Sequence, residues 1–321
     1  WFDEAIDLPV DLPNNDIIAK NKEYLVLAAM LLVLMAMFPL MNLLTATPVF
    51  AAVIQEKPSE YAIKPFASRL KGALITILLS AVTFPFLTQL GHGLLPLPEN
   101  IFRMTVGNGF LCWYLVLIII MLITSLISAR KNTSKEQFKP LAFIESLLLA
   151  VIMCGMVYLV NWAYTAIFNL DLRFIWPFFR PFTMSRFLQF LVYLPFFALF
   201  YYLNNTKIMR DLRTKSVYKK GLFGFIGNWF VNFLLMAGGV MIIVLIEYIP
   251  FFAGIGPGAD LLFGSTFGGP FMSILILFVP QVFFFSILCT FAYRMTGRAY
   301  TGAMLAAMLA CWIVTGGSSF L

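Results

Sequence analysis

The sequence predicts an all-α integral membrane protein that crosses the bilayer about eight times. Apolar residues make up 61% of the 321 residues and charged residues only 12%, against roughly 45–50% and about 25% in ordinary soluble domains. The apolar residues are gathered into runs near the ~20 residues that a helix needs to cross the hydrocarbon core. The 22 Lys and Arg residues are concentrated in alternate connections between these runs. The composition therefore excludes an ordinary soluble domain.

Residues 1–23 differ from the rest of the chain and form an acidic stub ahead of a membrane domain at residues 24–321. The stub holds six acidic residues and two basic ones. Pro9 and Pro13 end any helix that starts at Trp1, because proline has no backbone N–H. The chain begins with Trp1 rather than Met. We expect either that an upstream part has been removed or that the chain is one part of a longer polypeptide.

Eight apolar runs follow, and each is close to the length of a membrane-crossing helix with its rise of ~1.5 Å per residue. Pro85 and Gly91 interrupt the second run, and glycine and serine residues dilute the end of the eighth. The predicted spans are residues 24–46, 73–90, 109–128, 143–168, 182–203, 222–247, 271–293 and 301–321.

The basic residues orient these spans. The odd-numbered connections hold sixteen Lys and Arg residues and the even-numbered connections three. Short connections rich in Lys and Arg stay on the cytoplasmic side of a membrane. We therefore expect the odd-numbered connections to be cytoplasmic and both termini to be extracytoplasmic.

The most basic connection is residues 204–220, with six Lys and Arg residues and one acid, Asp211. We interpret these charges as determinants of topology that also contact anionic lipid headgroups. The net charge of +7 is explained in the same way, so membrane lipids are expected partners and nucleic acid is not.

Ionisable residues near the predicted outer face are the first candidate site, because charge at membrane depth is costly and often functional. They lie in or beside the second, fourth and sixth connections. Residues 169–182 interleave arginine with aromatic residues, as at a membrane interface. The alternative for each is a solvent-facing or snorkelling side chain. The candidate polar cluster is His92, Arg103, Asp171, Arg173, Arg180, Arg186, Glu247 and Asp260.

Amides inside the apolar runs are the second candidate site. Asn228 and Asn232 are four residues apart and share a helix face. Such amides either hold helices together through hydrogen bonds or line a path for a polar solute. The candidate path is Asn161, Gln189, Asn228, Asn232 and Gln281.

The sequence offers no catalytic constellation and no cofactor or metal site. The four cysteines lie singly within apolar runs, without the spacing of a metal site or redox pair. His92 is the only histidine, and we expect it in a loop. Paired carboxylates and a nucleophile with its base are both lacking, so an intramembrane enzyme is the weakest functional hypothesis.

The first fifty residues carry a resemblance. They read FDEAI, then LPVDLPNNDIIAKNKEYL, then an apolar run that ends LLTATPVFAAV. This pattern resembles the junction in bacterial membrane-bound α/β-hydrolase proteins of the dienelactone-hydrolase-like type, where the hydrolase domain runs into a multi-span C-terminal region. The resemblance implies a protein of the bacterial cytoplasmic membrane, with a hydrolase domain upstream of Trp1 and outside the cytoplasm. The catalytic serine, acid and histidine of that family would all lie upstream as well.

Two functions remain open from the sequence. The first is a membrane domain that anchors or serves an extracytoplasmic hydrolase and handles a lipid or other amphiphile. The second is a secondary transporter or permease for a small solute, with the amides as its path.

Overall fold

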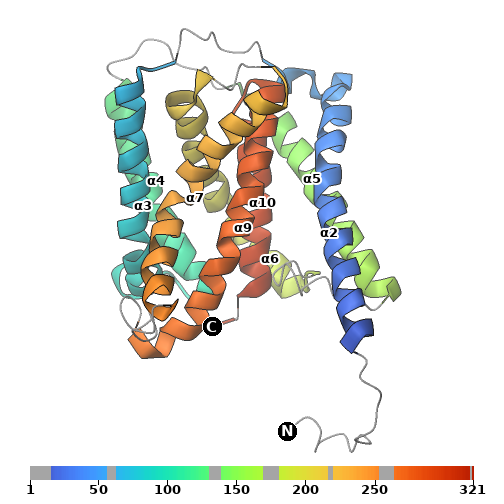
Figure 1. Cartoon of the computed structure of the whole chain (residues 1–321), viewed down its shortest axis with the longest axis vertical. Coiled ribbons are helices and arrows are strands. Elements are labelled where there is room, and N and C mark those ends of the chain that lie inside the picture. Colours follow the sequence, from blue (N-terminus) through green and yellow to red (C-terminus); the bar gives the residue numbers. More distant parts are fainter. Residues whose placement is uncertain are drawn as a thin grey trace, which may run out of the picture.

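The computed structural model describes residues 16–55, 63–129, 139–168, 181–215, 220–252, 264–318 and 320–321 (Figure 1). Within these ranges the regular structure is helical, apart from one isolated antiparallel bridge between Met104 and Phe320. The predicted all-α architecture is confirmed.

Eight long helices in the described residues correspond to the eight predicted runs. Two shorter helical segments adjoin them, a 3₁₀ helix η1 (Pro48–Val53) and a π-helix η4 (Lys207–Leu212). The long helices are α2 (Asp16–Thr45), α3 (Phe66–Leu94), α4 (Thr105–Ala129), α5 (Pro140–Phe168), α6 (Met184–Thr206), α7 (Leu222–Phe252), α9 (Gly264–Thr296) and α10 (Tyr300–Gly317).

Six of these helices, searched over their described residues, are long and apolar enough to cross a membrane: α3, α4, α5, α6, α7 and α10. In α2 the apolar stretch found by the same search is shorter, Leu31–Thr45. The protein is therefore a polytopic membrane protein.

Successive helices run in opposite directions, so the molecule has two distinct ends (Figure 1). Helices α2, α4, α6 and α9 finish at the upper end, and α10 finishes at the lower end, where α2 begins. We call the upper end the basic end and the lower one the terminal end. The odd-numbered connections thus share one end, as the charge pattern requires. Which end faces the cytoplasm stays a prediction.

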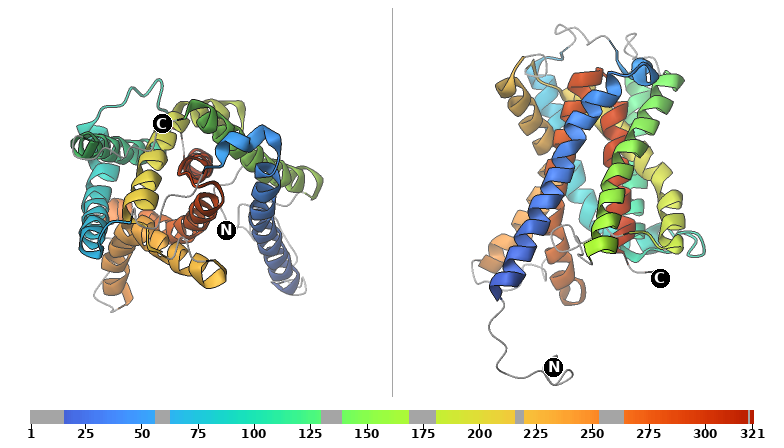
Figure 2. Two further views of the ribbon diagram at one scale, coloured as in Figure 1. Left: turned by 90° about the horizontal axis from the view of Figure 1, so that it is seen from above. Right: turned by 90° about the vertical axis from the view of Figure 1, so that its right-hand side faces the viewer.

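Helix α10 forms the centre of the bundle, with α5, α6 and α9 packed around it (Figure 2). Every residue from Tyr300 to Gly316 is buried. Small residues allow this close packing: a Cβ on Gly302 would lie 2.7 Å from Cys289 Cα. The last predicted span is therefore surrounded by protein rather than lipid.

Helix α3 lies at the periphery and packs on α4 and α7. No residue of its apolar stretch is buried until Phe84. The contact with α7 depends on a glycine, because a Cβ on Gly239 would lie 2.5 Å from Ser80 Cβ and 2.9 Å from the Ala81 backbone nitrogen.

Several predicted boundaries were wrong. The connection expected at residues 204–220 is helical up to Leu212, because Ile208, Met209 and Leu212 are apolar and become buried. Helix α3 continues through Gly91 to Leu94. Helix α2 begins at Asp16, ahead of the first predicted span at residue 24, and the division into a stub and a membrane domain stays a prediction. At the other end of the chain, α10 stops at Gly317.

Candidate functional site

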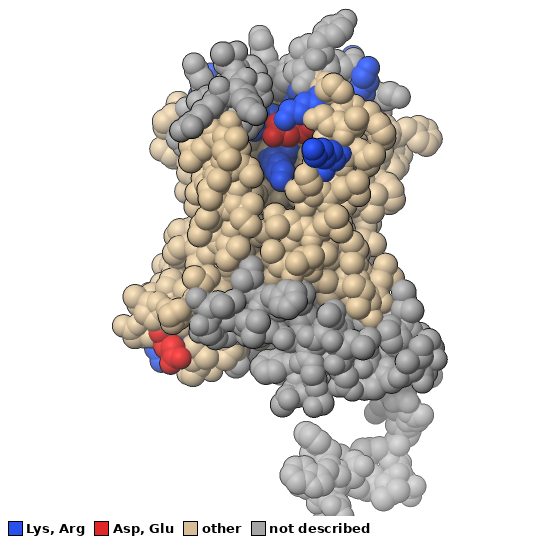
Figure 3. Space-filling view, turned by 90° about the vertical axis from the view of Figure 1, so that its left-hand side faces the viewer, with Lys and Arg blue, Asp and Glu red and all other residues tan. Residues whose placement is uncertain are grey.

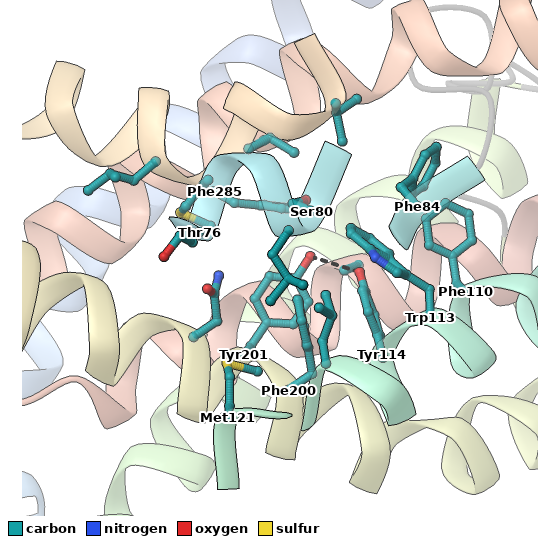
Figure 4. Close-up of a pocket in the computed structure, with 18 of the residues that line it drawn as sticks. Thr76, Ser80, Phe84, Phe110, Trp113, Tyr114, Met121, Phe200, Tyr201 and Phe285 are labelled. Carbon is teal, nitrogen blue, oxygen red and sulfur yellow. Dashed lines mark hydrogen bonds between the residues drawn. The ribbon is translucent and has the colours of Figure 1, made fainter. Parts of the chain in front are cut away.

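A cavity of about 90 Å³ lies within the bundle, enclosed mainly by α3, α4 and α6, with α7, α9 and α10 completing it. Figure 4 shows side chains from these helices directed toward a shared space. Residues four apart supply each wall, since they share a helix face: Thr76, Ser80 and Phe84 on α3, and Trp113, Leu117 and Met121 on α4.

The wall nearest the middle of the bundle is aromatic. The rings of Tyr114 and Phe200 are stacked, with centroids 3.9 Å apart and planes 8° apart. The hydroxyl oxygens of Tyr114 and Tyr201 are 3.5 Å apart (Figure 4). Trp113 donates its indole N–H to Thr83 Oγ1 at 3.1 Å. Stacked rings fixed by hydrogen bonds form a rigid apolar surface.

Polar groups face the same cavity and have no hydrogen-bond partner in the described part of the chain. They are the Ser80 hydroxyl and the amides of Asn204 and Gln281. Gln281 is only 3% exposed. Ser80 and Asn204 are half-buried, and polar groups that line a cavity without a protein partner are able to bond to a polar ligand atom.

Lys207 lines the cavity at the basic end. It starts the π-helix η4, and π-helical turns are rare and frequent at functional sites. Its side chain is half-buried, and among the described residues its ammonium forms no hydrogen bond or ion pair. Asn204 lies one turn earlier, so both side chains lie on the same side of the helix.

The nearby acid Asp211 attracts the Lys207 ammonium at a distance but forms no ion pair with it. Asp211 Oδ1 accepts from Lys64 Nζ at 3.4 Å and from Arg210 Nε at 2.9 Å, and its Oδ2 accepts from Arg210 Nη2 at 3.3 Å. Two other cations, Lys64 and Arg210, therefore already occupy this carboxylate. Figure 3 shows basic and acidic side chains gathered at the basic end of the α3–α4 side, where the surface is hollowed.

A larger groove of about 520 Å³ lies between α5 and α6, with Trp312 and Met308 of α10 at its floor. Its lining is apolar and aromatic, and its polar groups are the hydroxyls of Thr183 and Tyr158. With no charged group in its lining, it offers contact to hydrocarbon but no means of selecting a headgroup. The cavity beside Lys207 is the stronger candidate site.

Two residues of the predicted outer-face cluster come together at the terminal end. Arg186 Nη1 donates to the carbonyl oxygens of Thr315, Gly316 and Ser318, at 2.5, 3.1 and 2.9 Å. These carbonyls end α10, where a cation complements the helix dipole. The guanidinium carbons of Arg186 and Arg103 lie 5.3 and 5.9 Å from the Phe320 ring centroid.

Gln189 was predicted in the amide path but lies beside this cluster. Its Oε1 accepts from the Arg103 backbone N–H at 3.0 Å, and its Nε2 donates to the Ile101 carbonyl at 3.1 Å. Ser318 Oγ accepts from the N–H groups of Val106 and Gly107 at 2.9 and 3.2 Å, which caps the start of α4. These bonds tie α4, α6 and α10 together.

The side chains of the other cluster residues lie outside the described part of the structure. His92 lies in the last turn of α3 and Glu247 within α7, so the expectation of a loop histidine was wrong; their side chains fall outside the described part. Both residues are helical because α3 extends to Leu94 and α7 extends to Phe252, beyond the ends of the predicted apolar runs. Asp171, Arg173, Arg180 and Asp260 lie outside the described residues.

The remaining amides divide by position. Asn232 donates through Nδ2 to Thr290 Oγ1 at 2.8 Å and to the Ser286 carbonyl at 3.1 Å, which joins α7 to α9. Asn228 Oδ1 accepts from Thr214 at 3.5 Å. Asn161 is buried in α5. Of the five predicted path residues, Gln281 is the one in the cavity lining, and a solute path through the rest stays a prediction.

Sequence reasoning missed most of the cavity. It assigned Lys207 to topology and did not single out Thr76, Ser80, Tyr114 or Tyr201. A spacing of four in TxxxSxxxF on α3 and in WxxxLxxxM on α4 is present, but the same spacing occurs on any helix face. Among the described residues, no group of three or more His, Cys, Asp or Glu could hold a metal ion.

No family model, curated protein or solved structure matches the chain. The hydrolase resemblance of the first fifty residues therefore stays an expectation.

Proposed function

We propose that this protein is a membrane domain that binds an amphiphile in the cavity between α3, α4 and α6. The observation that carries the proposal is the pairing, within one cavity, of a rigid aromatic wall with Lys207 and polar groups that lack partners. An apolar chain fits the first and a polar headgroup fits the second.

The cavity's size and position support partial enclosure of the ligand. An apolar cavity of ~150 Å³ holds a benzene-sized molecule, so about 90 Å³ takes a short part of a chain. The remaining chain would lie in the bilayer, which the peripheral helix α3 faces along its unburied apolar stretch.

The test is photo-crosslinking in lipid nanodiscs with a twelve-carbon amphiphile that carries a diazirine within its chain. We expect crosslinks to peptides that contain cavity residues such as Tyr114 and Tyr201. Leu117→Trp, which fills the cavity, removes these crosslinks. Ile119→Trp is the matched control on α4, since Ile119 is 54% exposed, and it leaves them unchanged. Crosslinks that are confined to outward-facing residues, or that survive Leu117→Trp, overturn the proposal.

The hydrolase resemblance adds a finer proposal, that this domain serves an extracytoplasmic hydrolase located upstream in the same polypeptide. It is supported by the sequence of residues 1–53 alone. The mass of the native polypeptide tests it, together with labelling by an impermeant serine-hydrolase probe on intact cells. A native polypeptide of the mass of this chain, 36.3 kDa, contradicts it.

Secondary transport of a small solute is the second candidate, favoured by the position of Gln281 in the cavity lining. Proteoliposomes that contain the 321-residue chain would then take up solute, and Gln281→Leu would abolish uptake. Amphiphile crosslinking without any uptake favours binding over transport.

A further inference from the structure

We infer that the cavity selects an amphiphile whose headgroup is a single anionic group, a carboxylate or a phosphate monoester, and that Lys207 is the residue that recognises it. This inference rests on the proposed function and names the ligand class of the same site. The chain of the ligand would lie against Tyr114 and Phe200, with its headgroup at the basic end.

The charge of the site supports an anion. Lys207 lines the cavity. Outside the lining, the ion-paired group of Lys64, Arg210 and Asp211 adds two positive charges and one negative charge, so the four residues together have a net charge of +2. Both oxygens of Asp211 are already engaged by Lys64 and Arg210. The Lys207 ammonium is thus a partly desolvated cation without a hydrogen-bonded partner among the described residues, a state that an anionic ligand would relieve.

The hydrogen-bonding groups fit a small oxyanion. Lys207 offers an ammonium and Asn204 an amide N–H on the same side of the helix, and Ser80 offers a hydroxyl from α3. All three line one cavity and have no partner in the described part of the molecule. Donors outnumber acceptors in this set. A neutral sugar or glycerol headgroup would leave the ammonium unpaired.

The space argues for one chain. The aromatic wall is fixed by stacking between Tyr114 and Phe200, at 3.9 Å, and the cavity of about 90 Å³ is smaller than the ~150 Å³ that accepts a benzene-sized molecule. A second acyl chain has no place beside the first. The ligand would therefore place one chain in the cavity, and the simplest ligands of this kind are single-chain anionic amphiphiles such as a fatty acid or an alkyl phosphate.

Competition against the crosslinking amphiphile tests this inference. In nanodiscs of a zwitterionic lipid, the competitors are dodecanoate, dodecyl phosphate, dodecanol and inorganic phosphate. We expect both anionic amphiphiles to compete about tenfold better than dodecanol, which is the size of one charged hydrogen bond. Inorganic phosphate does not compete, because it lacks the chain. Competition by inorganic phosphate at the concentration of dodecyl phosphate would instead identify a free-anion site and overturn the inference.

Two substitutions locate the effect at Lys207. Lys207→Met keeps the length of the side chain and removes its charge, and it abolishes the preference for anionic competitors. Lys207→Arg retains the preference. Lys71→Met is the matched control, because Lys71 is an exposed lysine near the same end of α3 and outside the cavity lining, and it changes nothing.

The outcomes separate the inference from the function on which it rests. If cavity crosslinks persist but anionic and neutral competitors are equal, the amphiphile function stands and the anionic ligand class is wrong. The same conclusion follows if Lys207→Met keeps the preference. If cavity crosslinks are not formed by the wild type, the proposed function itself fails.

Discussion

Helix α6 has a cationic side chain near each of its ends, and the two differ in what surrounds them. At the terminal end, Arg186 donates to three carbonyl oxygens that end α10 and lies against the Phe320 ring. Just past the basic end, Lys207 faces a cavity and has no hydrogen-bonded partner among the described residues. Both are cations beside one spanning helix, yet the first completes the structure and the second is available to a ligand.

Arg186 and Lys207 are expected to have different roles, the first in stability and the second in ligand binding. A cation whose hydrogen bonds are all made within the protein stabilises the folded state, and its removal leaves the acceptor groups unpaired. A partly buried charge that the protein leaves unpaired costs free energy in the folded state. The largest effects on stability are therefore expected at the terminal end, and the effects on ligand preference at the basic end.

Arg186→Met gives the largest expected loss of stability. It removes three hydrogen bonds from one guanidinium to the end of α10, so we expect the free energy of unfolding to fall by about 3 kcal/mol, the upper range for charged hydrogen bonds. Denaturant unfolding in detergent micelles measures it. Arg103→Met is the control, since it removes only an exposed contact with Phe320. Equal losses of stability for both variants would show that the three hydrogen bonds of Arg186 do not stabilise the fold.

Gly239→Ala is expected to cost about 2 kcal/mol by overpacking, because its Cβ would lie 2.9 Å from the Ala81 backbone nitrogen. Shifting α3 also weakens crosslinking in the cavity, since Ser80 lies at the same contact. Gly155→Ala is the matched control in α5, where no atom lies within 4 Å of the new Cβ. Thermal unfolding compares the two variants, and a Gly239→Ala protein as stable as Gly155→Ala would show that α3 can move without cost.

Ser318→Ala and Ser80→Ala compare a bonded hydroxyl with an unbonded one. Ser318 caps α4 through two backbone N–H groups, and loss of a cap costs about 1 kcal/mol. Ser80 has no hydrogen-bond partner among the described residues, so its removal leaves the stability within about 0.5 kcal/mol. Unfolding of both variants in one detergent measures the difference. A larger loss of stability for Ser80→Ala than for Ser318→Ala would contradict the proposed difference between the two ends.

Lys207→Met is expected to leave the free energy of unfolding within about 0.5 kcal/mol of wild type or to raise it, because it removes a partly desolvated charge that has no ion pair or hydrogen bond among the described residues. This stands against the large loss for Arg186→Met in the same assay. A loss near that of Arg186→Met would mean that Lys207 has a structural partner, and the interpretation of the cavity would have to change.

The orientation of the two ends in the membrane is tested by thiol labelling rather than by stability. In a cysteine-free background, Lys71→Cys places a thiol at the exposed basic end. We expect an impermeant thiol reagent to label it only after the cells are permeabilised, because basic connections are retained in the cytoplasm. Labelling in intact cells would reverse the predicted topology and place the anionic headgroup in the outer leaflet.

The membrane-spanning elements were predictable from the sequence because each depends on local composition. The apolar runs near residues 109–128 and 143–168 have the length that a bilayer demands, and α4 and α5 cover them. Boundaries were less predictable where the chain departs from the membrane. Residues 207–212 read as a charged connection, yet Ile208, Met209 and Leu212 extend the helix because they pack into the bundle.

The candidate sites were less predictable, since a site depends on which helix faces meet. Gln189 and Asn232 read alike as amides in apolar runs, but one bonds to the loop before α4 and the other joins α7 to α9. The resemblance of the first fifty residues could not help, because the cavity is built from later helices.

The sequence by itself determined that the chain is an all-α membrane protein with alternating helices and one strongly basic end, because hydrophobic length and Lys and Arg counts act locally along the chain. Only the tertiary structure decided that α10 is the buried centre, that Arg186 is hydrogen-bonded to the end of α10, and that Lys207 faces a cavity. These facts depend on packing between helices far apart in the chain. Lys207 and Arg186 differ in their neighbours, which no local pattern records.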